Sequence, residues 1–200
     1  MRPELILISG CTGSGKTTLG MSIALNKGIV KCVSTDTIRE VLRTMRSDEA
    51  LIRSSYGGTG DPIIQWKECC SVMESSINRV VDDAIRRGTS LVLEGVHIVP
   101  SNTLLDKWTV NGGVAVGVVL SIPDEKTHFE VLNHRGKVTR KGAEKQLTAF
   151  HRIRAIHDEM VRLGDEHNWL LIEQKIERDP ISMITDVLEE RLDDIFYEPT

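Results

Sequence analysis

The chain has 200 residues, of which 40% are hydrophobic and 27% are charged, and it carries a formal net charge of −4. This length and composition are ordinary for a globular protein, mark no linker and predict a single domain over residues 1–200. The small negative charge gives no overall attraction to nucleic acid or to an anionic membrane, so we expect neither as a partner.

The cysteines and the N-terminal sequence give the cellular setting that we expect. Cys11, Cys32, Cys69 and Cys70 lack the spacing of a zinc ribbon, and a chain of this size does not depend on a disulfide scaffold. The first apolar run, "LILI", is too short for a signal peptide or a membrane span. These features predict a cytoplasmic protein, and they leave its oligomeric state open.

The first sixty residues predict two strand and helix pairs. The run "ELILISG" is typical of a short buried strand, and the helix that follows from residue 16 ends at Gly28. "IVKCVSTD" predicts a second strand, after which Thr35 or Asp36 can cap a helix over 37–47. A polar segment at 48–60 interrupts the pattern.

The middle of the chain contains the clearest helix signal. Asp61 is placed to cap this helix, Pro62 to occupy its first turn and Gly88 to end it. A third strand, "TSLVLEG", a short helix, "SNTLLDKW", and a fourth strand, "GVAVGVVLSI", follow in order. The fourth strand is continuously apolar, which indicates burial on both faces.

The sequence after residue 122 predicts a helix from Pro123 to about Asn133, a basic hinge "HRGKVTRKG" and a long amphipathic helix over 143–163. "WLLIE" predicts a fifth strand, and a helix with an acidic outer face over 181–196 closes the chain. The alternation of apolar strands and helices predicts an α/β fold, with a mostly parallel five-stranded sheet and helices on both faces.

Residues 10–17 match the phosphate-binding pattern G-x-x-x-x-G-K-[ST] in full, between a predicted strand and a predicted helix. In such a loop, backbone N–H groups and the helix N-terminus bind phosphate, Lys16 reaches the β and γ phosphates, and Thr17 ligates Mg²⁺. The residues predicted to bind nucleotide here are Gly10, Cys11, Thr12, Gly13, Ser14, Gly15, Lys16, Thr17 and Thr18.

Asp36 follows the second predicted strand, at the sheet edge where parallel α/β proteins bind ligands, and Arg39 lies one helical turn later on the same face. A carboxylate there can orient or deprotonate an acceptor hydroxyl, and a guanidinium can hold an anionic group of the acceptor. We therefore predict that both residues contact substrate and that Asp36 takes part in catalysis.

Glu94 ends the third predicted strand, where many P-loop proteins carry the aspartate that positions Mg²⁺. The longer glutamate can hold a Mg²⁺-bound water or reach the acceptor hydroxyl, so metal ligation and general base catalysis both stay open. Gly95 permits a close backbone approach to substrate. His97 is a candidate substrate contact, although a packed, hydrogen-bonded histidine explains the same position.

The basic hinge is the concentrated positive patch of the sequence. Phosphoryl transfer needs cations and the exclusion of water, so we expect a helical lid at about 133–143 with Arg135 over the nucleotide phosphates. Arg152 and Arg154 are two positions apart on the long helix and point to different faces. Of the two, we predict that Arg154 enters the site and binds substrate.

The segments "GCTGSGKTTL", "VSTDTIRE", "LVLEGVHIVP" and "RIRAIHDEM" together resemble the archaeal 2-phosphoglycerate kinases, which are P-loop kinases with a nucleoside-monophosphate-kinase-like core. The resemblance extends from Ser9 to Met160. It implies ATP-dependent, Mg²⁺-dependent phosphorylation of a hydroxyl on a small phosphorylated hydroxy acid. It also implies functional roles for Lys16, Thr17, Asp36, Arg39, Glu94 and Arg154.

The sequence departs from the longer members of that family, which carry an additional N-terminal domain, because the first predicted strand begins near residue 4. A shorter branch that this sequence resembles phosphorylates the 5-hydroxyl of mevalonate 3-phosphate in an archaeal isoprenoid pathway. Chain length therefore favours mevalonate 3-phosphate as the expected acceptor, with 2-phosphoglycerate as the alternative.

Three other classes of protein share a P-loop. A GTPase switch requires an Asn-Lys-x-Asp segment, which "NKGI" does not provide. A polynucleotide kinase is supported only by the basic hinge, against a net charge of −4 and 4% aromatic residues. A non-catalytic nucleotide-binding module does not require Lys16, Asp36 and Glu94 together, so a kinase is the preferred prediction.

Overall fold

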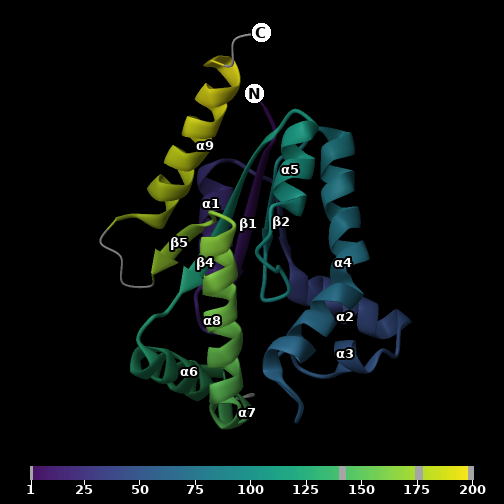
Figure 1. Cartoon of the computed structure of the whole chain (residues 1–200), viewed down its shortest axis with the longest axis vertical. Helices are drawn as coiled ribbons and strands as arrows, with labels where there is room; N and C mark the ends of the chain where they lie inside the picture. Colours follow the sequence, from purple (N-terminus) through teal and green to yellow (C-terminus); the bar gives the residue numbers. More distant parts are fainter. Residues whose placement is uncertain (1, 140–142, 174–177, 198–200) are drawn as a thin grey trace.

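The computed structural model describes residues 2–139, 143–173 and 178–197, and it gives only the backbone for residues 135–139, 143–145 and 194–197. In the described residues the strands form one five-stranded sheet in the order β2-β3-β1-β4-β5, and every pairing is parallel (Figure 1). The strands are β1 (Glu4–Gly10), β2 (Lys31–Ser34), β3 (Leu91–Glu94), β4 (Val114–Ser121) and β5 (Leu170–Glu173). The predicted α/β class and five parallel strands are confirmed.

Helices cover both faces of this sheet. Apolar side chains of α4, α5 and α8 pack on one face, and those of α1 and α9 pack on the other. The helices are α1 (Lys16–Asn26), α2 (Thr35–Met45), α3 (Glu49–Ile52), α4 (Pro62–Arg87), α5 (Thr103–Val110), α6 (Glu125–Thr139), α7 (Ala143–Thr148), α8 (Phe150–Glu166) and α9 (Pro180–Tyr197). No helix among the described residues is long and apolar enough to cross a membrane.

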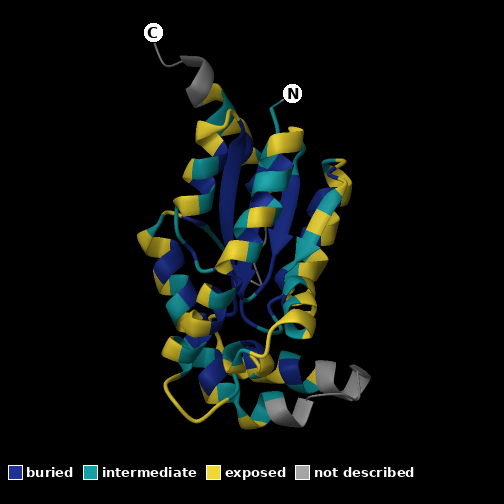
Figure 2. Cartoon of the chain, turned by 90° about the vertical axis from the view of Figure 1, so that its right-hand side faces the viewer, coloured by how far each residue is buried: buried dark blue, intermediate teal, exposed yellow. Residues whose placement is uncertain are grey.

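The core follows from the alternation of side chains along the strands. In β1, Leu5 and Leu7 face the α4, α5 and α8 side, while Ile6 and Ile8 face α1 and α9. Every residue of β4 is buried, as its continuous apolar run predicts. Figure 2 shows the strands as a buried layer between helices whose outer faces are exposed.

Strand register brings the chemistry to one edge of the sheet. Glu94, the last residue of β3, is aligned with Ile8 of β1 and with Ser34 of β2. Because all strands are parallel, their carboxyl ends lie at the same edge. The loop after β1, the start of α2 and Glu94 therefore converge on one region of the molecule.

The structure corrects the predicted start of α2. The helix begins at Thr35, and Ser34, rather than Thr35 or Asp36, is the capping residue because its hydroxyl accepts a hydrogen bond from the Asp36 N–H at 3.3 Å. By contrast, α4 has the predicted cap at Asp61, Pro62 in its first turn and a left-handed Gly88 at its end.

The predicted basic hinge is also corrected. Helix α6 continues to Thr139, through most of the segment that we expected to be a hinge, and residues 140–142 lie outside the described residues. Arginine and lysine favour helix, and one internal glycine weakens a helix without ending it. The long helix expected at 143–163 is instead divided into α7 and α8 at Ala149. A short helix, α3, lies within the segment at 48–60.

Candidate active site

The loop between β1 and α1 has the backbone conformation of a phosphate-binding loop. Gly13 and Gly15 have backbone φ values of 88° and 90°, which residues other than glycine rarely adopt. A Cβ on Gly13 would lie 2.9 Å from the Leu132 side chain of α6, so this residue also lets α6 pack against the loop. Packing against α6 is therefore one reason for a glycine at position 13.

The carbonyl oxygen of Cys11 organises the loop interior. It accepts hydrogen bonds from Lys16 Nζ at 2.7 Å, from Ser14 Oγ at 3.0 Å and from Ser14 N at 3.3 Å. The Lys16 ammonium is therefore held over the loop. The Cys11 thiol is buried, and this burial raises its pKa to about 11, so the thiol is neutral near pH 7.

Thr17 and Glu94 form the second part of the site. The Thr17 hydroxyl donates a hydrogen bond to Glu94 Oε1 at 3.1 Å, and Glu94 is only 3% exposed. A hydroxyl and a carboxylate are oxygen ligands of the kind that Mg²⁺ takes. The described residues contain no group of three His, Cys, Asp or Glu side chains suited to a metal, so an ion here would need phosphate oxygens as further ligands.

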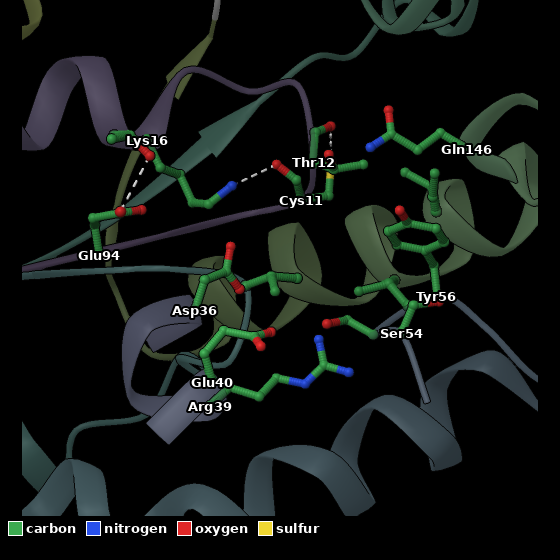
Figure 3. A pocket seen from close by; sticks show the side chains of 15 residues that line it. Cys11, Thr12, Lys16, Asp36, Arg39, Glu40, Ser54, Tyr56, Glu94 and Gln146 are labelled. Atoms are coloured by element: carbon green, nitrogen blue, oxygen red, sulfur yellow. Dashed lines mark hydrogen bonds between the residues drawn. The ribbon is translucent and has the colours of Figure 1, made fainter. Parts of the chain in front are cut away.

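A cavity of about 330 Å³ opens between these groups and the start of α2 (Figure 3). Its walls come from the phosphate-binding loop, α2, the residues before α4, the end of β3, and α7 with α8. The lining residues are Cys11, Thr12, Lys16, Thr17, Asp36, Arg39, Glu40, Ser54, Ser55, Tyr56, Glu94, Val96, Gln146, Ile153 and Ile156. The cavity thus brings together the predicted Lys16, Thr17, Asp36, Arg39 and Glu94.

Asp36 and Arg39 reach this cavity in different ways. The Asp36 side chain is 73% exposed and lies on the wall opposite the phosphate-binding loop (Figure 3). Arg39 is buried, and it donates from Nε to the carbonyl of Leu51 at 3.1 Å and from Nη2 to the carbonyl of Arg53. It therefore satisfies carbonyls at the end of α3 while it lines the cavity.

His97 lies behind the cavity wall. Its ring is buried and shares hydrogen bonds with Thr35 Oγ1 at 3.1 Å through Nδ1 and with Ser55 Oγ at 2.9 Å through Nε2. Burial, and then the positive charge of Arg39, lower the pKa of His97 to about 3, so the ring is neutral near pH 7. His97 is absent from the cavity lining, and its ring connects α2 to the segment before α4.

Gly95 is in contact with α2. A Cβ on Gly95, whose φ is 153°, would lie 1.7 Å from Thr35 Oγ1. The sequence predicts that Gly95 lets substrate approach the backbone, whereas the close neighbour of Gly95 in the structure is Thr35, the first residue of α2.

The two arginines at the start of α8 have different partners. Arg152 is buried and donates to the carbonyls of Tyr56 at 2.9 Å and Gly60 at 2.6 Å and to Gln65 Oε1 at 2.7 Å. It therefore holds the segment that forms one cavity wall.

Arg154 donates to the carbonyl of Ile122 at 2.7 Å, to Asp158 Oδ1 at 3.0 Å and to His128 Nδ1 at 3.3 Å. It is absent from the cavity lining among the described residues. The backbone of Arg135 lies in α6, and its side chain lies outside the described part of the chain.

Several lining residues have no local signal in the sequence. Ser54, Ser55 and Tyr56 lie in the segment that we interpreted only as an interruption, and Gln146 lies on α7, where the sequence shows no motif. Glu40 belongs to the quoted segment "VSTDTIRE", but we predicted no role for it. The segment at 48–60 is polar, contains several glycines and lies between two helices. In a protein with a phosphate-binding loop, such a connecting segment is a candidate for a further wall of the ligand cavity.

The comparisons with known proteins agree with this geometry. The model of the family described as "AAA domain" matches residues 5–160. A 2-phosphoglycerate kinase of Methanocaldococcus jannaschii is 32% identical over 202 residues, covering 96% of this chain and 65% of the relative. A protein of the same name from Methanopyrus kandleri is 29% identical over 204 residues, covering 95% of this chain and 62% of the relative. The chain thus spans slightly less than two thirds of the length of these two relatives.

The named relatives agree with the predicted resemblance to 2-phosphoglycerate kinases. They give no support to the expectation of mevalonate 3-phosphate, which was based on chain length.

Solved structures match the fold at low sequence identity. A gluconokinase from Sinorhizobium meliloti has a TM-score of 0.54 at 16% identity and covers 99% of this chain and 98% of its own. A shikimate kinase from Acinetobacter baumannii has a TM-score of 0.53 at 15% identity, with coverages of 97% and 95%. The fold is therefore that of small P-loop kinases. With the family match over residues 5–160 and an intact phosphate-binding loop, the chain belongs to the AAA domain family of P-loop proteins.

Proposed function

We propose that this chain is a kinase domain that transfers the γ-phosphoryl group of ATP to a hydroxyl of a small molecule. The observation that supports the proposal is that one cavity is lined by Lys16, by the Thr17 and Glu94 pair, and by Asp36 on the opposite wall. A protein that only held nucleotide would not need a second carboxylate facing its phosphate-binding loop.

The nucleotide and metal fit the residues that are present. Backbone N–H groups of residues 10–18 and the N-terminus of α1 would hold the phosphates, and Lys16 would supply a side-chain cation. Thr17 and Glu94 would hold Mg²⁺ together with phosphate oxygens. When it is bound, Mg²⁺ neutralises charge on the transferring phosphoryl group.

We assign different roles to the two carboxylates. Glu94 is buried at the end of β3 and accepts the Thr17 hydrogen bond, which supports a role at the metal. Asp36 is exposed to the cavity from the other wall, which supports a role in orienting the acceptor hydroxyl and accepting its proton. This assignment separates the metal ligand from the general base, two roles that Glu94 alone could fill in principle.

For the acceptor, we propose 2-phosphoglycerate, supported by the names of the archaeal relatives. Among the described residues, Arg39 donates to the carbonyls of Leu51 and Arg53, and its other guanidinium N–H groups would bind an anionic group in the cavity. Mevalonate 3-phosphate combines the same groups, namely a carboxylate, a phosphate and a free primary hydroxyl, and it is the second acceptor to compare.

The test is ADP release from Mg-ATP with each acceptor in turn, with the product identified by ³¹P NMR. A new bisphosphate from 2-phosphoglycerate is the expected result. Lys16→Met should abolish it, whereas Lys27→Met should not, because Lys27 follows the far end of α1 and pairs with Glu4. Equal ADP release with and without either acceptor would contradict the proposal, and product from mevalonate 3-phosphate alone would change only the acceptor.

A further inference from the structure

Helix α6 places a buried histidine against the phosphate-binding loop. His128 is 0% exposed, and its Nε2 lies 3.0 Å from the carbonyl oxygen of Thr12 and 3.6 Å from Cys11 Sγ. Leu132, one turn later on the same face of α6, is the residue that a Cβ on Gly13 would meet. One face of α6 therefore forms an outer wall of the loop.

The partners of His128 define its tautomer. A carbonyl oxygen only accepts hydrogen bonds, so Nε2 carries the proton that is donated to Thr12. Nδ1 lies 3.3 Å from Nη1 of Arg154, which only donates, so Nδ1 is the acceptor. A neutral ring with one donor and one acceptor satisfies both neighbours, and burial lowers the pKa of His128 in agreement with a neutral ring.

Arg154 is itself held in place by α8 and by the end of β4. The Ile122 N–H donates to His157 Nε2 at 3.0 Å, so His157 Nδ1 carries the proton that is donated to Asp158 Oδ1 at 2.7 Å. The same Asp158 oxygen accepts from Arg154 Nη2 at 3.0 Å. The hydrogen bonds thus run in one consistent direction from Arg154 through His128 to Thr12.

The contact with Thr12 determines the orientation of one peptide group in the loop. The Thr12 carbonyl and the Gly13 N–H belong to the same planar trans peptide and point in opposite directions. When the carbonyl is bound to α6, the N–H is directed away from α6. Backbone N–H groups in this orientation are the donors with which such loops bind phosphate.

We propose that His128 is a positioning residue that holds the Thr12 peptide of the phosphate-binding loop in its nucleotide-binding orientation, with Arg154 orienting the ring. This inference rests on the proposed function, because it assumes that the loop binds nucleotide. It also gives Arg154, and the segment "RIRAIHDEM" to which it belongs, a role on the nucleotide side of the site.

The test compares two amides at position 128. The amide of His128→Asn occupies the place of Nδ1, near Arg154, and is too short to reach Thr12. The amide of His128→Gln reaches the place of Nε2 and restores the donor. Ile184→Val controls for lost stability, because Ile184 is buried in the core on the α1 and α9 face of the sheet. Calorimetry with Mg²⁺ and a non-hydrolysable ATP analogue measures binding without any acceptor.

We expect His128→Asn to bind the analogue about tenfold more weakly than the wild type, which is the effect of one buried hydrogen bond. His128→Gln and Ile184→Val should bind within about threefold of the wild type. Equal binding by a folded His128→Asn protein overturns the role of His128, as does equally weak binding by His128→Gln. If His128→Asn does not fold, His128→Ala takes its place. A wild type that binds no nucleotide overturns the proposed function, and this inference with it.

Discussion

Thr17 and Glu94 are 77 positions apart in the sequence, and the Thr17 hydroxyl donates to the Glu94 carboxylate at 3.1 Å. The parallel pairing of β1 with β3 aligns Ile8 with Glu94 and so brings the end of β3 beside the loop that leads into α1. The pair is therefore a consequence of strand order, and it places two oxygen atoms of the kind that Mg²⁺ takes beside the phosphate-binding loop.

Glu94→Gln should keep the hydrogen bond with Thr17 and lose the negative charge. If Glu94 acts at the metal, we expect kcat to fall by about 100-fold and the Mg²⁺ concentration needed for half-maximal activity to rise. Titration of activity with Mg²⁺ at saturating ATP measures both. Glu40→Gln is the control, because Glu40 lines the same cavity, pairs with Arg43 and has no contact with Thr17. An unchanged Mg²⁺ requirement in Glu94→Gln would exclude the metal role.

Asp36→Asn should lower kcat by about 10²-fold or more while the KM for ATP stays within about twofold, because the amide cannot accept the hydroxyl proton. Steady-state kinetics with each substrate varied in turn separates these effects. Asp106→Asn, an exposed position on α5, is the control. Near-normal turnover of Asp36→Asn would remove Asp36 from the mechanism and leave Glu94 as the candidate base.

Local chemistry decided which parts of the fold could be predicted. The ends of α4 were predicted correctly because they depend only on neighbouring residues. Asp61 caps the first turn, Pro62 lies within it, and Gly88 ends the helix in a left-handed conformation. At α2, Ser34, Thr35 and Asp36 are all good capping residues in succession, so the sequence does not show which of them caps the helix. The basic segment after Asn133 gives two opposing signals. Its clustered charges are typical of a loop, but its residues favour a helix, and in the structure α6 continues through it to Thr139.

The candidate site divides in the same way. Glu94 ends β3, Asp36 lies in the first turn of α2 after β2, and Lys16 and Thr17 begin α1 after the phosphate-binding loop. Parallel topology and the recognisable loop motif bring these residues to one edge of the sheet, and all four line the cavity. The contacts of the arginines and of His128 depend on which loop or helix packs opposite them. A single sequence does not contain that information.

Gly95→Ala tests the contact between β3 and α2. A Cβ would lie 1.7 Å from Thr35 Oγ1 at a φ of 153°, so α2 would have to move. We expect a loss of about 2 kcal/mol or more in the free energy of unfolding, measured by urea denaturation. Gly28→Ala is the control, since its φ is also positive, at 64°, but nothing lies within 4 Å of the new Cβ. It should lose only about 1 kcal/mol, and equal losses in the two variants would show that packing against Thr35 is unimportant.

His97 should make stability depend on pH. Burial lowers the pKa of His97 from 6.5 to about 3, so between these values the unfolded chain binds a proton that the folded chain does not. The free energy of unfolding therefore decreases as pH falls below 6.5. From pH 7.5 to pH 5 this one group contributes a loss of about 2 kcal/mol.

His97→Gln keeps one donor and one acceptor for Thr35 and Ser55 and does not titrate. Urea denaturation at pH 7.5 and pH 5 should therefore show a smaller loss for this variant than for the wild type, by about 2 kcal/mol. His151→Gln, at an exposed position of α8, should retain the loss seen in the wild type. If His97→Gln and the wild type lose stability in parallel, then His97 is not the group that titrates.

Arg152 gives a prediction about the acceptor side of the cavity. Its guanidinium binds the carbonyls of Tyr56 and Gly60, and residues 54–56 line the cavity as part of the segment before α4. Arg152→Met would keep much of the buried volume and lose these hydrogen bonds, so the wall would no longer be held in one conformation. We expect the KM for the acceptor to rise about tenfold while the KM for ATP stays within about twofold.

The matched control is Arg162→Met on the same helix, because Arg162 is exposed and pairs only with Glu159 and Glu166 in the described part of the chain. Surface ion pairs of this kind contribute little to stability, so both KM values should be unchanged. An equal rise of both KM values in Arg152→Met would mean that Arg152 supports the whole cavity. A rise confined to the acceptor would place the acceptor against residues 54–56, on the wall that Arg152 holds.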